Sequence, residues 1–316
     1  MRWWWYGGSW AARKIPFLVE KEQYFIEKYL NNLSFKSSEY PIGIGDDCAV
    51  IESNESLITS KDISVSGVHF PEELDPYFVA YRSVAIAISD VFAMGGTPKA
   101  YLLGITHPEP KDSWFNNFSK GLKDLNTEYE LNLLGGDLTR GELNISVTVF
   151  GHANKNLLKR TGANVGDLIF ISNTLGRGKK GFIDYKKNGN SELNHYLKPK
   201  LPLNLVQELA PLATSCIDVS DGLLIDLKRI CDSSEVGAVI NLNREMFITD
   251  KDDLVAGDDY VLCFTAKERN KEKILSLKSS IKLIGRIEKG SDLKIFDNDK
   301  KEIKFENKGW DSFGSI

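Results

Sequence analysis

The chain has 316 residues, of which 42% are hydrophobic and 27% charged, and its formal net charge is −4 at pH 7. This length accommodates about two domains, each large enough for a hydrophobic core of its own. The charge gives no overall bias towards nucleic acid or anionic membranes, and no apolar run in the sequence approaches the roughly 18 residues of a membrane span. We therefore expect a cytoplasmic protein that has neither nucleic acid nor a membrane as a partner.

Cysteine usage agrees with a reducing compartment. The four cysteines, Cys48, Cys216, Cys231 and Cys263, are scattered and form no C-x-x-C pair. This pattern argues against a disulfide scaffold and against a zinc site. Residues 1–16 are rich in tryptophan but contain no sustained aliphatic core, so they make a poor signal peptide. We treat them as a leader or tag-like extension without a part in the function.

Helical and strand-like patterns alternate in the first half of the chain. The clearest helix covers residues 76–94, where apolar side chains recur at helical spacing, and Gly95, Gly96 and Pro98 end it. Residues 144–151 alternate apolar and polar side chains, which is typical of a half-buried strand. Together the patterns predict helices over residues 21–33, 76–94 and 113–130, and strands over residues 49–51, 56–59, 101–106, 131–134 and 144–151.

A short, polar, turn-like stretch at residues 151–156 indicates a domain boundary. We place an N-terminal domain at residues 17–152 and a C-terminal domain at residues 153–316. Helices mixed with strands in both halves indicate an α/β or α+β fold in two domains. In the second half the patterns predict strands over residues 167–172, 260–265 and 281–287, helices over residues 203–212 and 223–231, and a loop or exposed helix over residues 179–190.

Aspartate recurs directly after short apolar or glycine-rich runs, in segments far apart in the sequence. A carboxylate beside buried apolar segments loses hydration, so it must be paired or bind a metal. Several carboxylates that converge on one cleft repel one another unless hard cations neutralise them. Mg²⁺ with a polyphosphate is the natural occupant, because Mg²⁺ binds carboxylate and phosphate oxygens together. The pattern therefore favours a phosphoryl-transfer enzyme, and the aspartates concerned are Asp47, Asp62, Asp90, Asp137, Asp218 and Asp221.

Each of these segments, taken alone, also fits an ordinary structural role. Residues 43–47 fit a surface turn equally well. Residues 134–141 offer backbone N–H groups and an arginine to phosphate, but they also fit a glycine-rich connection. Ser220 or Asp221 fits the N-cap of the helix that follows, although a cap does not explain a second acid at Asp218.

Other chemical signals are weaker. His69 is a lone histidine, and it fits a satisfied structural residue better than a ligand. Residues 176–181 superficially resemble a phosphate loop, but Phe182 follows the last glycine where that loop needs a lysine. No serine–histidine–aspartate or cysteine–histidine order has local support, so no nucleophilic catalyst is indicated.

In their order along the chain, the segments resemble those of bacterial thiamine-monophosphate kinases. The resemblance runs from residue 42 to residue 313, and although no single segment decides it, the ordered set is highly specific. It rests on Gly43-Ile44-Gly45-Asp46-Asp47, residues 62–70 ending in Gly67-Val68-His69-Phe70, Ile88-Ser89-Asp90-Val91-Phe92-Ala93-Met94-Gly95, residues 135–141, Lys159-Arg160-Thr161-Gly162-Ala163, residues 217–224, Asp259-Tyr260-Val261-Leu262-Cys263-Phe264 and Lys308-Gly309-Trp310-Asp311.

The resemblance implies ATP-dependent transfer of the γ-phosphoryl group to thiamine monophosphate, which gives thiamine diphosphate. It also implies a fold shared with aminoimidazole ribonucleotide synthetase and selenophosphate synthetase. In that fold the N-terminal domains, with a mixed sheet and helices, pair in a homodimer, and ATP lies in a cleft between domains. Carried over by position, the magnesium ligands would be Asp47, Ser60, Asp62, Asp90, Asp137, Asp218 and Asp221, the ATP contacts Gly136, Asp137, Arg160 and Ser220, and the thiamine phosphate contacts His69, Asp258 and Trp310.

No catalytic side chain is expected under this hypothesis. The nucleophile is a phosphate oxygen with a second pKa of about 6, so it is largely ionised at neutral pH without a general base. Positioning and cation charge then overcome the repulsion between the two anions. The thiazolium ring of the substrate is cationic, which makes an acid and an aromatic face suitable neighbours.

Three positions depart from the family pattern. Lys61 stands beside the metal aspartate where threonine is usual, so its ammonium would repel Mg²⁺ or replace one ion. Asp258 stands where glutamate is usual, and residues 176–181 are more basic. These departures leave an alternative open, namely a non-catalytic or altered member that binds ATP and Mg²⁺.

Overall fold

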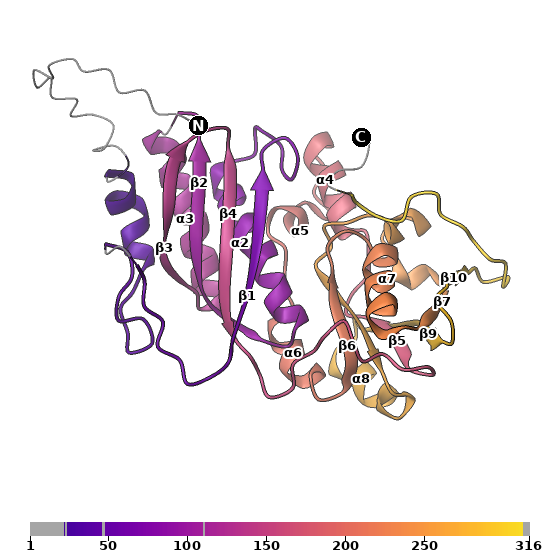
Figure 1. The fold of residues 1–316 in the computed structure, drawn as a ribbon. Coiled ribbons are helices and arrows are strands. Elements are labelled where there is room, and N and C mark those ends of the chain that lie inside the picture. The colour runs from indigo at the N-terminus through magenta and orange to yellow at the C-terminus, as the bar shows by residue number, and fades with distance from the viewer. Residues whose placement is uncertain (1–21, 23, 46–47, 110, 312–316) are drawn as a thin grey trace, which may run out of the picture.

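The computed structural model describes residue 22 and residues 24–45, 48–109 and 111–311. It shows two sheets with their helices, side by side (Figure 1). The N-terminal half holds a four-stranded sheet in the order β1-β4-β2-β3, in which β2 and β3 are parallel and β4 is antiparallel to both of its neighbours. The strands are β1 (Leu57–Val65), β2 (Thr97–His107), β3 (Asn132–Arg140) and β4 (Asn144–His152).

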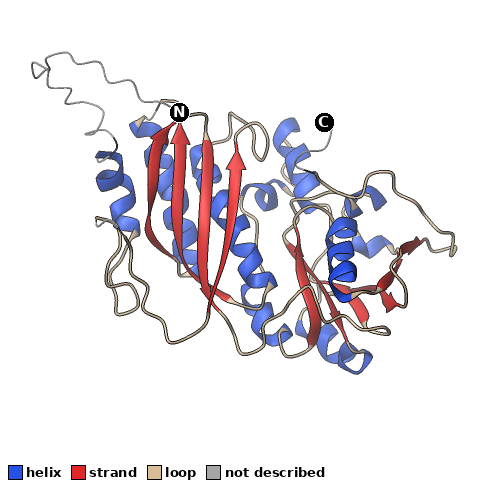
Figure 2. Ribbon diagram, viewed as in Figure 1, coloured by secondary structure: helices blue, strands red, loops and turns tan. Residues whose placement is uncertain are grey.

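Two long helices, α2 (Pro76–Ala93) and α3 (Asp112–Tyr129), cover one face of this sheet (Figure 2). The start of α2 is well capped, because the Asp75 side chain accepts a hydrogen bond from the Tyr77 N–H at 2.8 Å and Pro76 occupies the first turn. Apolar side chains of both helices and of the strands beneath them form one core. Since α2 also contacts elements of the second half, several of its polar side chains are buried as well.

The other face of the N-terminal sheet carries no helix of the described residues (Figure 1). Side chains alternate along a strand, so Ser60 and Asp62 of β1 turn towards α2 and Lys61 turns to this open face. A hydrogen bond from Ser60 to Asp90 of α2 and one from Lys61 to Ser146 of β4 confirm these directions. β1 and β3 form the two edges of the sheet.

The C-terminal half holds a six-stranded sheet in the order β10-β7-β9-β5-β8-β6, in which β10 and β7 are parallel and the other neighbours antiparallel. None of the helices in the described ranges is long and apolar enough to cross a membrane. The strands are β5 (Leu168–Ile171), β6 (Ala213–Val219), β7 (Gly237–Asn241), β8 (Val261–Ala266), β9 (Lys282–Glu288) and β10 (Leu293–Phe296). The further helices are α4 (Arg177–Lys187), α5 (Leu193–Leu197), α6 (Leu203–Leu209), α7 (Leu223–Ser234) and α8 (Lys271–Leu277), with short helical turns η1 (Ile26–Leu30), η2 (Asn31–Leu33), η3 (Arg244–Met246), η4 (Lys251–Leu254) and η5 (Glu268–Asn270).

Most of the predicted elements are confirmed. Helices α2, α3 and α7 and strand β4 follow the predicted segments closely, and residues 179–190 are mainly helical, because α4 covers most of them. Mixed sheets with helices in both halves make the fold α+β. The homodimer and the domain boundaries stay predictions, and residues 1–16 lie outside the described residues.

One predicted strand and one of the open alternatives are wrong, and three strands are not predicted. Residues 49–51 form no strand, and Val50 makes only an isolated bridge with Ile42. The segment after Leu134 is not a connection, because β3 continues to Arg140 and pairs with β2. Strands β6, β7 and β10 are missing from the prediction, since their 7, 5 and 4 residues give a weak pattern.

Candidate active site

A cleft between the two halves contains two cavities that meet. The smaller has a volume of about 430 Å³ and the larger about 780 Å³. Asp90 of α2 and Asp218 of β6 line both cavities, so these two carboxyl groups mark the junction. The cleft thus brings together side chains from both sheets.

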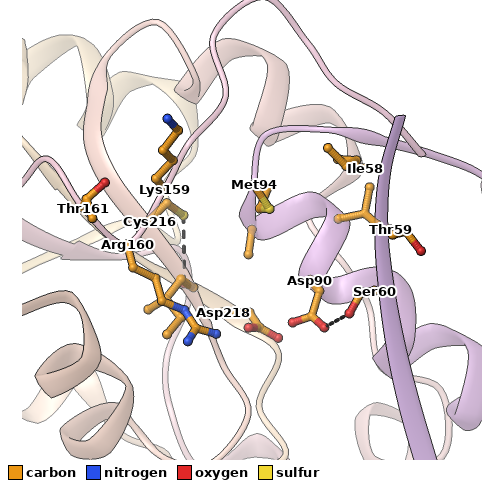
Figure 3. Close-up of a pocket in the computed structure, with 13 residues that line it drawn as sticks. Ile58, Thr59, Ser60, Asp90, Met94, Lys159, Arg160, Thr161, Cys216 and Asp218 are labelled. Carbon is orange, nitrogen blue, oxygen red and sulfur yellow. Dashed lines mark hydrogen bonds between the residues drawn. The ribbon is translucent and has the colours of Figure 1, made fainter. Parts of the chain in front are cut away.

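Three aspartates and a serine from three elements lie near this junction. Ser60 and Asp62 lie on β1, Asp90 on α2 and Asp218 near the end of β6. The Ser60 hydroxyl donates to the Asp90 carboxylate, and the Ser89 hydroxyl donates to Asp218 Oδ2 at 2.7 Å. Figure 3 shows the carboxyl groups of Asp90 and Asp218 facing each other at the smaller cavity. We call Asp62, Asp90, Asp218 and the neighbouring Asp221 the acid cluster.

Burial and mutual repulsion make it hard for these acids to ionise together. Burial, followed by the charges of Asp90 and Asp221, raises the pKa of Asp62 to about 6. Burial and the charge of Asp90 raise the pKa of Asp218 to about 8, although the Ser89 hydrogen bond opposes the shift. Such a cluster attracts hard cations, because a bound cation favours the ionised form of every carboxylate around it.

The oxygen donors of the cluster suit Mg²⁺, although they do not form a closed cage. Among the described residues, no three acidic, histidine or cysteine side chains surround a common point as a preformed metal site requires. In nucleotide sites Mg²⁺ is usually held by one or two carboxylates together with phosphate oxygens and water. The open arrangement of the cluster fits that mode. Asp47, a further predicted ligand, lies outside the described residues.

Asp221, a member of the acid cluster, does not cap α7. The N-cap of the helix is Gly222, and Asp226 in the first turn accepts hydrogen bonds from the Asp221 and Gly222 N–H groups at 3.1 and 3.2 Å. The expectation that Ser220 or Asp221 caps this helix is therefore wrong. Both residues line the larger cavity, and the Asp221 carboxylate also pairs with Arg229 at 2.8 Å.

Basic groups lie at the smaller cavity. Lys159, Arg160 and Thr161 line it, on the segment that leads from β4 into β5. Figure 3 shows the Arg160 side chain reaching along the Asp218 side of this cavity. A planar guanidinium with several donors suits phosphate oxygens. The structure therefore brings the predicted ATP contact Arg160 to the acid cluster.

The predicted substrate residues His69, Asp258 and Trp310 all line the larger cavity. His69 Nδ1 accepts a hydrogen bond from the Val65 N–H at 3.0 Å, which leaves the ring proton on Nε2. Trp310 is 46% exposed, and its backbone N–H donates to the Asp221 carbonyl at 2.8 Å. The backbone of Trp310 is thus tied to Asp221, and the residue keeps an exposed surface for a ligand.

Asp258 already has a cationic partner, which the sequence patterns do not indicate. Nη2 of Arg82, on α2, donates to both Asp258 carboxyl oxygens, at 2.8 and 3.0 Å. A single arginine within an apolar helical pattern usually reaches solvent, so no local signal singles out Arg82. Asp226 is missed for the same reason, because its burial depends on the fold.

Asp137 lies away from the acid cluster within one chain. The register of the sheet connects Ile63 of β1 through Ser146 and Gly104 to Asp137, so three strand spacings, about 14 Å, separate Asp137 from β1. Its neighbour Leu138 belongs to the core beneath the helices, and alternation therefore turns Asp137 to the open face. The structure of one chain does not bring Asp137 together with the other predicted metal ligands.

Lys61 also turns to the open face of the sheet. Its Nζ donates to Ser146 Oγ at 2.6 Å, whereas Asp62, the next residue, turns towards α2 and the cleft. The expectation that the Lys61 ammonium lies beside the metal-binding carboxylate is therefore wrong within one chain.

Comparisons of the sequence and of the structure with known proteins show to which family the chain belongs. The family model for AIR synthase related protein, N-terminal domain, matches residues 45–153, and the model for AIR synthase related protein, C-terminal domain, matches residues 164–298. Thiamine-monophosphate kinase of Buchnera aphidicola subsp. Acyrthosiphon pisum is 37% identical over 317 residues, which cover 91% of this chain and 97% of that protein. The Escherichia coli K12 protein of the same name is 31% identical over 316 residues, which cover 92% and 97%.

The chain belongs to the thiamine-monophosphate kinase family. As a member of a kinase family, it is an enzyme that transfers phosphoryl groups. The crystal structure of thiamine-monophosphate kinase from Stenotrophomonas maltophilia K279a has a TM-score of 0.79 and 30% identity, and the match covers 88% of this chain and 97% of that chain. The structure of AaThiL complexed with AMPPCP and TMP has a TM-score of 0.73 and 28% identity over 96% and 100% of the two chains. Hydrogenase maturation protein HypE, at 14% identity and a TM-score of 0.70, shares the fold alone.

Proposed function

We propose that the protein transfers the γ-phosphoryl group of ATP to thiamine monophosphate in the cytoplasm and so forms thiamine diphosphate. The observation that carries this proposal is the acid cluster at the junction of two cavities, with Arg160 on one side and Trp310 on the other. Two anionic substrates that enter from the two cavities would meet at Asp90 and Asp218. Relatives named thiamine-monophosphate kinase, and the AaThiL complex with AMPPCP and TMP, support this choice of substrates.

The smaller cavity suits the nucleotide. Arg160 would bind phosphate oxygens there, because its guanidinium lies beside the cluster. Ser220 follows Asp218 by two residues and lines the larger cavity. ATP phosphates that reach the junction would therefore contact both Arg160 and Ser220.

The larger cavity suits thiamine monophosphate. Trp310 offers an exposed aromatic surface, which attracts the cationic thiazolium ring. His69 can donate a hydrogen bond from Nε2, and Asp258 can accept one. The phosphate end of the substrate would then point to the acid cluster.

This arrangement supports direct in-line transfer. The attacking and leaving oxygens must lie on opposite sides of the transferred phosphorus, and the two cavities extend from the junction at Asp90 and Asp218. The acceptor is a phosphate monoester that is largely ionised at neutral pH, so no side chain has to take its proton. Mg²⁺ would supply the positive charge that lets the two anions approach, held by Ser60, the acid cluster and Asp47.

A second copy of the chain would complete the nucleotide site. Asp137 and Gly136 lie on the edge strand β3, about 14 Å from β1 of the same chain. A two-fold pair of sheets that brings β3 of one copy to β1 of the other would place both residues at the cleft of the second copy. We therefore include a homodimer in the proposal.

The test is a direct assay with the purified protein. ATP, Mg²⁺ and thiamine monophosphate should yield ADP and thiamine diphosphate, and Asp90→Asn should abolish the product while the protein stays folded. Asp299→Asn, in the exposed loop after β10, is the matched control and should keep wild-type activity. Calorimetric binding of ATP and Mg²⁺ without product would contradict the proposal and support the non-catalytic alternative.

A further inference from the structure

We propose that Arg82 is a positioning residue for the thiamine substrate. It holds the Asp258 carboxylate at a point in the larger cavity that lies two helical turns along α2 from the acid cluster. The inference rests on the proposed function, because it concerns the substrate end of the same cleft. It goes further in that it assigns a role to a buried arginine that contacts no reacting atom.

The contacts of Arg82 fix the orientation of its guanidinium group. The residue is 5% exposed, and its Nη2 donates to both Asp258 oxygens at 2.8 and 3.0 Å. Its Nη1 donates to the Tyr196 carbonyl oxygen, and the guanidinium carbon lies 4.1 Å from the centre of the Tyr196 ring. A planar fork that is both paired and stacked is fixed in position. Arg82 thereby joins α2 of the first half to α5 and to the loop before β8.

The backbone of Asp258 is held as tightly as its side chain. Its φ of 70° lies in the left-handed region, which non-glycine residues adopt rarely. Its N–H donates to the Ser220 carbonyl at 2.8 Å. A Cβ added at Gly178 would lie 2.2 Å from the Asp258 carbonyl oxygen, so the start of α4 is packed closely against this loop. Strained backbone that the surroundings hold in place often marks a functional site.

The pair is also nearly neutral. Burial acts to lower the pKa of Arg82, but the charge of Asp258 and further contacts outweigh it and raise that pKa. Arg82 therefore stays charged and cancels the Asp258 charge. This part of the cavity offers oriented hydrogen-bond acceptors to the substrate, and the attraction for its cationic ring comes from the aromatic face of Trp310.

Helix α2 connects the two ends of the substrate. Arg82, Ile86 and Asp90 follow one another at intervals of four residues and all line the larger cavity. Residues at this spacing share one face of a helix, and the rise between Arg82 and Asp90 is about 12 Å. A substrate that meets Asp258 with its ring end and Asp90 with its phosphate is therefore aligned along one buried helix. A change at Arg82 should weaken substrate binding and leave the acid cluster intact.

The experiment compares Michaelis constants for the two substrates. Arg82→Gln should raise the KM for thiamine monophosphate roughly tenfold, while the KM for ATP and kcat stay within about twofold. Arg82→Lys keeps the charge without the planar fork and should give a smaller rise in the same constant. When Asp258→Asn is added to Arg82→Gln, the KM for thiamine monophosphate should rise little further, because both substitutions disrupt the same Arg82–Asp258 pair. Arg177→Gln is the matched control, since it breaks an arginine–carboxylate pair of 2.8 Å with Glu192 and Arg177 is not a lining residue of either cavity.

The outcomes separate this inference from the proposed function. Wild-type protein that neither binds nor phosphorylates thiamine monophosphate contradicts both. An active wild type whose Arg82→Gln variant keeps its KM, raises both KM values equally, or loses kcat at unchanged KM contradicts the role of Arg82 alone. If Arg82→Gln fails to fold in a thermal melt, Arg82→Lys takes its place, and an unchanged KM for thiamine monophosphate in that variant overturns the inference.

Discussion

A buried aspartate such as Asp218 costs stability when no cation is bound. It is 5% exposed, lines both cavities with Asp90 and accepts a hydrogen bond from Ser89. Carboxylates that repel one another in the folded protein are far apart in the unfolded chain, so the repulsion lowers the free energy of unfolding. The same repulsion gives the site its affinity for cations. Function and stability therefore make opposite demands on this residue.

Asp218→Asn should abolish kinase activity and raise the melting temperature of the metal-free protein by about 2–5 °C. The amide keeps the size of the side chain and an oxygen for Ser89, and it is always neutral, so folding no longer has to bury a repelled charge or take up a proton to neutralise it. Thermal melts with and without Mg²⁺ and ATP measure this, and the ligands should stabilise the variant less than the wild type. Asp232→Asn is the control, because it breaks an exposed pair with Lys228 on α7 and should have little effect. A melting temperature below that of the wild type for Asp218→Asn would refute the expectation.

His195 gives a prediction on pH. It is 5% exposed, and burial followed by the Arg177 charge lowers its pKa from 6.5 to about 4. The imidazole of His195 takes up a proton near pH 6.5 in the unfolded chain but only near pH 4 in the folded protein. Protonation therefore favours the unfolded chain, and the free energy of unfolding falls as the pH is lowered from 6.5 to 4. His195→Gln keeps a donor for the Asp259 carbonyl, which His195 Nε2 contacts at 3.1 Å, but it does not ionise.

The free energy of unfolding of His195→Gln should therefore fall less steeply below pH 6.5, by up to about 3 kcal/mol at pH 4. Urea unfolding curves of both proteins between pH 4 and pH 7 measure the difference. Parallel pH profiles for the two proteins would show that His195 does not cause this dependence.

At the scale of elements, strand β3 depends on one glycine. Gly136 has a φ of 155°, and a Cβ there would lie 1.8 Å from the Leu103 carbonyl oxygen of β2. Gly136→Ala should therefore separate the paired strands and lower the free energy of unfolding by about 2–3 kcal/mol. Gly135→Ala is a neighbouring control, because its Cβ would make an ordinary contact of 3.5 Å with Leu102. Denaturant unfolding of both variants decides this, and equal stability would refute the steric role of Gly136.

The same strand shows what sequence patterns predict well and what they do not. Helices α2 and α3 are predictable because their apolar spacing repeats over many residues, and Gly95 stops α2. The Gly135-Gly136 pair favours a turn locally, and its pairing with β2 holds it in a strand. Long-range pairing of this kind leaves no local pattern.

The residues of the site also fall into those that sequence patterns indicate and those that they do not. Asp90 and Asp218 are recognisable because each closely follows an apolar run that ends at the cleft. Arg82 and Asp226 are not, because a charged residue within a helical pattern looks the same whether it is buried or exposed. Their burial comes from packing between halves or against a helix end, which only the folded chain shows.

At the scale of the whole molecule, the residues assigned to ATP lie in two places. Arg160 and Ser220 line the cleft between the halves, whereas Gly136 and Asp137 lie on the far edge of the N-terminal sheet. Strands β1, β2 and β3 run in the same direction, with β4 opposed to β1 and β2. A two-fold axis along the strands would preserve these directions and would present β3 of each copy to β1 of the other.

Mixing two inactive variants tests this arrangement. Asp90→Asn and Asp137→Asn should each abolish activity alone. If one site uses Asp90 of one copy and Asp137 of the other, a mixed dimer has one intact site and one with both changes. Co-expression in equal amounts, in which half of the dimers are mixed, should therefore restore about a quarter of wild-type activity.

The matched control combines Asp90→Asn with Asp218→Asn, which line the same cleft of one chain. In that mixed dimer each cleft carries one change, so no activity should return. Absence of recovery for Asp90→Asn with Asp137→Asn, in protein that light scattering shows to be dimeric, would place all the metal-binding aspartates in one chain. That result would contradict the proposed pairing of β1 and β3 edges between copies. It would also require Asp137 to reach the cleft of its own chain across the roughly 14 Å that separate β3 from β1.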